Sequence, residues 1–164
     1  MTYPFAAQAF DQIASQNFIN GVATAVDLLR APAVAFVPVI TGATTNPTNF
    51  TADASASYYV VQGYVCYMHA QLTARSGFTA GAGAYGISLP VAAAAVIDQT
   101  PFVVRALDTS AVANYPGQGR IFAGSSKVDR CYFTLGSTAT LSPTYPFTWA
   151  LDDTLTIDGS YLIA

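Results

Sequence analysis

Apolar and polar residues alternate with a period of two between Tyr64 and Arg75. The more apolar face carries Tyr64, Cys66, Met68, Ala70, Leu72 and Ala74, and the opposite face carries Val65, Tyr67, His69, Gln71, Thr73 and Arg75. This alternation predicts a long strand with one face on a core and one face toward water or a partner. A glycine-rich segment, 81–86, and a short apolar run, 87–89, follow and predict a hairpin with a return strand.

Further strand candidates recur along the chain between turns rich in Gly, Pro and Ser. Residues 34–40 predict an edge strand because Pro38 lies inside the run, and residues 115–119 predict a long loop. The other strand candidates are residues 101–107, 120–124, 130–135, 153–157 and 161–163. Short strands at this spacing indicate a mostly β fold, and we expect a jelly-roll-like antiparallel β-sandwich.

The N-terminal segment has a helical period instead. Apolar residues recur at helical spacing from residue 9 to residue 30, and Ala31-Pro32 ends the pattern. The apolar stripe is wide and almost uncharged, so we expect a short helical arm that serves as an anchor or oligomerisation element. The predicted division is an arm over residues 1–50 and a β-sandwich domain over residues 51–164. The anchor candidates are Phe10, Ile13, Phe18, Val22, Val26 and Leu29.

Charged residues make up only 9% of the chain, which has no Glu and a single Lys, Lys127. Because soluble domains usually have about 25% charged residues, we expect other protein chains to cover much of this surface. The expected partners are copies of the chain itself or members of a larger assembly. A net charge of −3 without a basic cluster argues against nucleic acid as a partner. No apolar run reaches the roughly 18 residues of a membrane helix, so no membrane insertion is expected.

Two sequence features resemble nucleotide-binding or catalytic motifs, but their sequence context argues against those functions. Residues 81–86 spell G-x-G-x-x-G, but a strand ended by Pro90 follows instead of a helix, so no nucleotide or other cofactor is predicted. A Ser-His-Asp triad would have to use His69, the only histidine, and no G-x-S-x-G elbow is present. We therefore predict a surface or interface histidine and no enzyme.

The cysteines and aspartates also favour structural roles. Cys66 and His69 are three residues apart on a strand and so point to opposite faces, which argues against a shared metal site. Cys66 and Cys131 both lie in apolar, strand-like surroundings and are predicted to be buried free thiols in a reducing cytoplasm. A loose Ca²⁺ site and plain turn chemistry are the alternatives for Asp152, Asp153 and Asp158. We favour turn chemistry.

Four aromatic residues lie in or beside Pro/Gly-rich segments: Tyr115, Tyr145, Phe147 and Trp149. Exposed rings at such positions would stack on sugars or contact a partner, whereas buried rings would plug the ends of the sandwich. Both alternatives stay open. The first alternative makes these residues candidates for surface recognition, including recognition of a glycan on a host surface.

Several short motifs together resemble a known family. They are Val37-Pro38-Val39, Thr45-Asn46-Pro47-Thr48, the strand entry at 58–65, Ile87-Ser88-Leu89-Pro90 and the closing segment 149–155. Residues 36–164 resemble the β-sandwich module of tailed-bacteriophage minor structural proteins. The resemblance implies a non-enzymatic virion component, such as a tail-fibre tip, a baseplate protein or a capsid decoration, and frequently a homotrimer. The chain has no long heptad stalk, so a compact module attached to capsid or tail is expected, in virions assembled in the bacterial cytoplasm.

Overall fold

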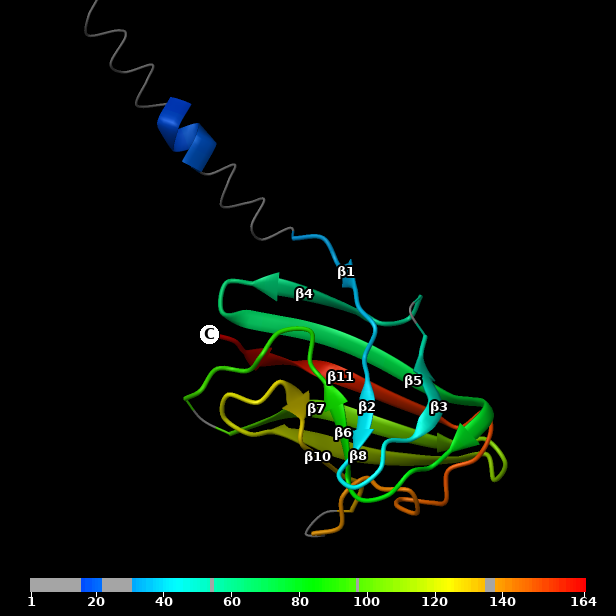
Figure 1. Cartoon of the computed structure of the whole chain (residues 1–164). Coiled ribbons are helices and arrows are strands. Elements are labelled where there is room, and N and C mark those ends of the chain that lie inside the picture. Colours follow the sequence, from blue (N-terminus) through cyan, green and yellow to red (C-terminus); the bar gives the residue numbers. More distant parts are fainter. Residues whose placement is uncertain (1–15, 22–30, 54, 97, 135–137) are drawn as a thin grey trace, which may run out of the picture. The chain divides into compact units, whose positions relative to one another are not determined.

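The computed structural model describes residues 16–21, 31–53, 55–96, 98–134 and 138–164 (Figure 1). The chain divides into two units, Met1–Pro32 and Ala33–Ala164. The second unit is mostly β, and its strands are β1 (Val34–Ala35), β2 (Ile40–Gly42), β3 (Thr48–Ala52), β4 (Tyr58–Gln62), β5 (Val65–Thr79), β6 (Tyr85–Ser88), β7 (Gln99–Asp108), β8 (Ala113–Ile121), β9 (Lys127–Val128), β10 (Arg130–Tyr132) and β11 (Thr154–Leu162).

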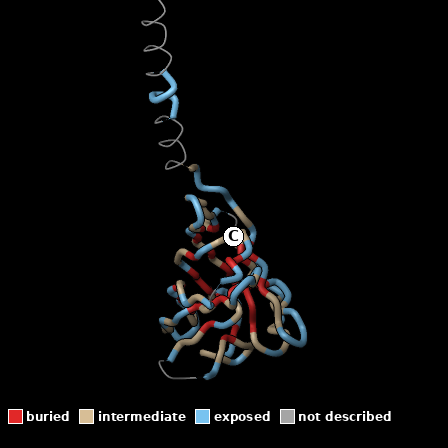
Figure 2. The backbone as a smooth tube through the Cα atoms, turned by 90° about the vertical axis from the view of Figure 1, so that its left-hand side faces the viewer, coloured by how far each residue is buried: buried red, intermediate tan, exposed pale blue. Residues whose placement is uncertain are grey.

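The strands form two antiparallel sheets. The larger sheet has eight strands in the order β1-β4-β5-β11-β7-β8-β10, with β3 also paired to β5. The smaller sheet has three strands in the order β2-β6-β9. Ile40, Ile87 and Val128 of the smaller sheet belong to the same buried cluster as Leu72 and Val104 of the larger one. The two sheets therefore contribute to one buried cluster, and Figure 2 shows the buried segments gathered inside the β unit.

The alternation that predicted the long strand is confirmed in β5. Cys66, Met68, Ala70, Leu72 and Ala74 are all buried, as the apolar pattern requires. Tyr64 is the exception: its side chain is 75% exposed, because the residue lies in the turn between β4 and β5 and not in the strand. The pattern thus predicted the face of the strand correctly and its start one residue too early.

The predicted hairpin after β5 is wrong. The return strand β6 pairs with β2 and β9 of the smaller sheet and not with β5. The glycine-rich segment therefore carries the chain from one sheet to the other. Gly81 has a φ of +63°, and a Cβ there would lie 2.7 Å from backbone atoms of Asn46 and Pro47. Glycine is needed at this position because the segment 45–47 approaches too closely for a side chain.

The strand predicted over residues 34–40 is divided between the two sheets. Val34–Ala35 pairs with β4 in the larger sheet, whereas Ile40–Gly42 pairs with β6 in the smaller one. Pro38 lies between the two and is buried. The compact β unit begins at Ala33, so the segment between Ala33 and residue 50 packs with it, whereas the sequence division placed that segment in the arm.

Within the predicted arm, residues 16–21 are helical and all exposed. The Gln16 side-chain amide donates a hydrogen bond to Asn20 Oδ1 at 3.1 Å, one helical turn away. Residues 9–15 and 22–30 of the predicted helix lie outside the described residues. The described part of the chain does not support a continuous helical arm.

The loop predicted over residues 115–119 is also wrong, because these residues form the middle of β8. Their glycines face the interior, where neighbouring rings occupy the space of a side chain. A Cβ at Gly117 would lie 2.9 Å from Cδ1 of Phe133, and a Cβ at Gly119 would lie 2.9 Å from Cβ of Phe102. Glycine here permits close packing within a strand and does not mark a turn.

Phe102 of β7 is flanked by glycine on both neighbouring strands. It is in register with Gly119 of β8 on one side and with Gly159 of β11 on the other. Its side chain is 2% exposed, and its ring centroid lies 5.7 Å from that of Tyr161. The two glycines provide the room that this ring requires at the centre of the sheet.

Substituting Gly159→Ala is expected to lower the free energy of unfolding by about 1–3 kcal/mol, the usual cost of overpacking. The new methyl group would overlap the Pro101 carbonyl oxygen and lie 2.7 Å from Cδ1 of Phe102. Denaturant unfolding measures the effect. The neighbouring substitution Ser160→Ala, on the opposite face of β11, serves as a control and should change stability little; equal stability of both variants would contradict this packing account.

Candidate functional site

The outer face of the eight-stranded sheet, opposite the shared core, presents several exposed side chains on neighbouring strands. Strand register places one residue from each of six strands in a row across it: Tyr58, His69, Asp158, Val103, Gln118 and Tyr132. Tyr58 is 47% exposed and Val103 is 65% exposed. Aromatic, apolar and hydrogen-bonding groups are therefore presented together on a regular antiparallel framework.

His69 lies within this row in a well-defined environment. Its Nδ1 contacts Oδ1 of Asp158, and the Tyr58 ring stacks on the imidazole at a centroid distance of 5.4 Å and an interplanar angle of 24°. A base oriented by a carboxylate is two-thirds of a triad. Among the described residues, no hydroxyl group hydrogen-bonds to the His69 ring, so the nucleophile of a triad is not in place. The described residues therefore show a His69–Asp158 pair with the Tyr58 ring stacked on it, and no more of a triad.

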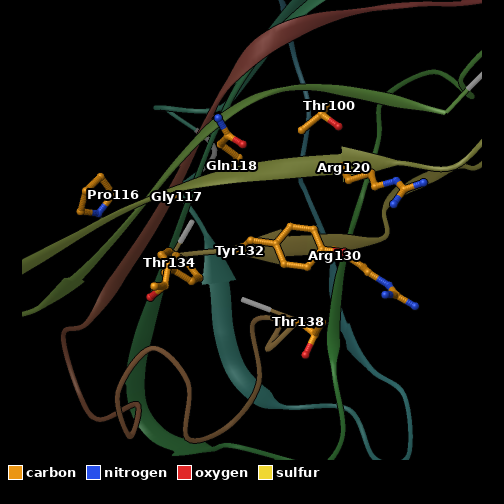
Figure 3. Close-up of a pocket in the computed structure, with 10 residues that line it drawn as sticks. Thr100, Pro116, Gly117, Gln118, Arg120, Arg130, Tyr132, Thr134 and Thr138 are labelled. Atoms are coloured by element: carbon orange, nitrogen blue, oxygen red, sulfur yellow. The ribbon is translucent and has the colours of Figure 1, made fainter. Parts of the chain in front are cut away.

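An open hollow lies at the β8–β10 end of the outer face (Figure 3). Its volume is about 590 Å³, within the roughly 300–1,000 Å³ typical of ligand pockets. The polar side chains that line it include Thr100, Gln118, Arg120, Arg130 and Tyr132. No carboxylate is among its described lining residues. The hollow thus offers hydrogen-bond donors and one phenol ring without a negative charge.

Sequence reasoning found no basic cluster and missed this hollow. Arg120 and Arg130 are directly opposite each other in the β8–β10 ladder, a relation that only the register reveals. The available signal was the alternation of residues 113–121, in which Asn114, Pro116, Gln118 and Arg120 fall on one face. The glycines between them made that stretch resemble a loop.

The four candidate recognition aromatics are not one exposed platform. Trp149 is 4% exposed and donates its indole N–H to the Ser142 carbonyl at 3.1 Å. Phe147 lies 4.7 Å from the Trp149 ring and 5.1 Å from the Tyr115 ring, and both Phe147 and Tyr115 pack against the core. Tyr145 is half-buried beside Phe133 at 5.9 Å. Trp149 therefore fits the alternative in which buried rings plug the end of the sandwich. Phe147 and Tyr115 pack against the same core.

The acidic trio does not converge on one point. Asp153 is 1% exposed, and its carboxylate accepts the backbone N–H groups of Thr109 at 2.9 Å and Ala150 at 2.7 Å. Asp158 lies further along β11, where it pairs with His69. In the described part of the chain, no three His, Cys, Asp or Glu residues are grouped closely enough to hold a metal ion. Asp153 therefore has the structural role of a turn residue: its carboxylate accepts hydrogen bonds from two loops at the end of the sheet.

Replacing Asp153 with Asn should lower the free energy of unfolding by about 1–3 kcal/mol, because one backbone N–H would then face an amide NH₂ instead of an oxygen. Asp152→Asn is the matched control. Asp152 is exposed and has a φ of +68°, a conformation that Asn tolerates. Thermal and denaturant unfolding of the two variants measures the difference, and an unaffected Asp153→Asn variant would show that these hydrogen bonds contribute little.

Both cysteines are buried free thiols, as the sequence predicted. Burial raises the pKa of the Cys131 thiol to about 12, and burial also raises the pKa of Cys66. Thiolate, the reactive form, is therefore scarce at neutral pH, and the sulfur atoms are shielded from reagents.

We expect neither thiol to react with a disulfide reagent at pH 8 while the protein is folded. Addition of denaturant should release two equivalents of thiol rapidly, because unfolding exposes both sulfur atoms and returns each pKa to its usual value. A spectrophotometric thiol assay makes the measurement. Fast modification of the native protein would contradict the burial of these residues.

The anchor candidates fall in the N-terminal unit. Phe18 is 73% exposed. The candidates Phe10, Ile13, Val22, Val26 and Leu29 lie outside the described residues. Among the described residues, no helix is long and apolar enough to span a membrane.

Comparison of this chain with models of protein families, with curated proteins and with solved structures finds no match. Functional conclusions therefore depend on the residues and geometry described above.

Proposed function

We propose that this protein is a non-enzymatic structural component of a tailed-phage particle, a capsid- or tail-attached module whose outer sheet face meets other protein chains. The observation that carries the proposal is the composition of that exposed face. Tyr58, Tyr67, Val103 and Leu162, which we call the apolar patch, lie on β4, β5, β7 and β11 around the His69–Asp158 pair and are between 41% and 65% exposed. Protein interfaces are rich in Tyr and Arg and poor in Lys and Glu, and this face has the same bias.

The scarcity of charge supports the same proposal. A chain with 9% charged residues has little solubilising surface to spare for an exposed apolar patch. Burial of the patch against sister subunits or other virion proteins would remove it from water. We propose a homotrimer as the self-association, in agreement with the family that the sequence motifs resemble, and a virion location after assembly in the host cytoplasm.

The two sheets support an unequal β-sandwich as the module, since they share one core. The jelly-roll-like connection and an anchoring role for the N-terminal unit, Met1–Pro32, are further parts of the proposal. Phe18 is suited to the anchor because it is a large apolar residue that is 73% exposed.

Mass spectrometry of purified particles tests the virion location, with the protein expected at a fixed copy number after extensive washing. The association is tested in solution by the double substitution Tyr67→Asp with Val103→Asp. Both side chains are exposed, so the variant should fold, and light scattering should report a shift from an oligomer to a monomer. A carboxylate buried in an interface without a partner is strongly unfavourable.

Val112→Asp is the control for this experiment. Val112 is 83% exposed but lies in the turn between β7 and β8, outside the apolar patch. A wild-type protein that stays monomeric at every concentration would refute the homo-oligomer. Absence of the protein from washed particles would refute the virion location.

A second candidate function is a carbohydrate-binding module for host recognition. The hollow beside Tyr132 supports it, because the hollow combines an aromatic ring with several hydroxyl, amide and guanidinium donors. The loop aromatics originally considered for this role support it less, since Trp149 is buried.

A further inference from the structure

The two arginines of the hollow form an unusual pair. Arg120 and Arg130 are directly opposite in the antiparallel ladder, where like charges repel. Figure 3 shows the two side chains extending in the same direction from neighbouring strands. Their guanidinium carbons lie 5.1 Å and 5.5 Å from the centroid of the same ring, that of Phe122. The fold thus holds two cationic groups together on one aromatic support.

Two carboxylates lie near the arginine pair, and neither is paired with Arg130. Asp98 bonds Arg120 Nη2 at 2.6 Å and the Ala123 backbone N–H at 2.9 Å. The hydrogen bond from the Ala123 N–H, and after it the one from Arg120, holds the pKa of Asp98 below its usual value. The carboxylate therefore stays ionised and paired. Asp129 accepts the Phe122 backbone N–H at 2.8 Å. Neither aspartate is among the residues that line the hollow.

Arg130 therefore differs from Arg120. Arg120 has its carboxylate, whereas Arg130 has no carboxylate within 4.0 Å among the described residues. Arg130 is exposed and lines the hollow, and its guanidinium carries five N–H donors in a planar fork. Such a fork matches a carboxylate in a bidentate geometry, and binding of a carboxylate would relieve the repulsion within the arginine pair.

The remaining lining suits a sugar. The Tyr132 ring offers an apolar face for C–H groups, and it is in register with Gln118, whose amide both donates and accepts hydrogen bonds. Thr100 adds a hydroxyl group at the same hollow. A neutral saccharide would leave Arg130 without a partner, and a bare inorganic anion would not use the ring.

We propose that the hollow at the β8–β10 end of the outer face binds an acidic saccharide, with Arg130 receiving its carboxylate and Tyr132 and Gln118 contacting the sugar ring. This inference depends on the second candidate function and specifies its site and ligand class. It is independent of the apolar patch and of the virion location.

The test is calorimetric titration of the full chain with two acidic probes, trigalacturonate and sialyllactose, and with their neutral counterparts, galactotriose and lactose. At least one acidic probe should bind about 10-fold more tightly than its counterpart, as expected for one charge-assisted bidentate contact. Arg130→Gln should remove this preference. Arg105→Gln is the control, because Arg105 is exposed on β7 on the same face but does not line the hollow.

The outcomes separate the inference from the function beneath it. Equal binding of acidic and neutral probes, or an acidic preference that survives Arg130→Gln, overturns the proposed site while the carbohydrate function stands. Inorganic phosphate that binds as tightly as the acidic probes reduces the hollow to a simple anion site and also overturns it. Failure of all four saccharides to bind refutes both the inference and the carbohydrate function.

Discussion

The pairing of the C-terminal strand β11 between β5 and β7 is the interaction on which the rest of the structure depends. β11 forms nine residue pairs with β5, from Thr154↔Thr73 to Leu162↔Val65, and six with β7, from Thr154↔Leu107 to Gly159↔Phe102. Without β11, strands β1, β3, β4 and β5 would have no hydrogen-bonded connection to β7, β8 and β10. Leu155 and Ile157 are fully buried at this seam, so hydrogen bonding and apolar burial act at the same place.

This seam also has consequences for folding and function. His69 and Asp158 are in contact although they are 89 positions apart in the sequence. The eight-stranded sheet is therefore complete only when β11 has paired. Contacts of such long sequence separation are typical of slow-folding β proteins. The same closure brings Tyr58, His69, Asp158, Val103 and Gln118 into one row. The outer face is therefore a product of the seam and cannot form in either half of the sheet alone.

Space at the seam is controlled by glycine. Phe102 occupies the interior at the level of β11, β7 and β8 because Gly159 and Gly119 lack side chains on the two neighbouring strands. Glycine often favours turns, but at these two positions it makes room for an aromatic ring at the centre of a sheet. The strand β8 that results directs Gln118 and Arg120 outward, toward Tyr132 and Arg130. On β8, Gly119 thus makes room for Phe102 on the inner face, and the next residue, Arg120, belongs to the arginine pair on the outer face.

The sequence by itself determined the mostly β character, the inward face of β5, the burial of Cys66 and Cys131 and the scarcity of surface charge, because each of these depends on local period or on composition. Tertiary structure alone decided that residues 115–119 form a strand and that β6 belongs to the smaller sheet. It also decided that Trp149 is buried and that Arg120 is opposite Arg130. Each of these depends on a neighbour distant in sequence. From the sequence alone, the glycines of residues 115–119 predicted a loop, because the rings that pack against them are distant in the sequence. Arg120 and Arg130 formed no cluster in the sequence, and only the strand register places them opposite each other.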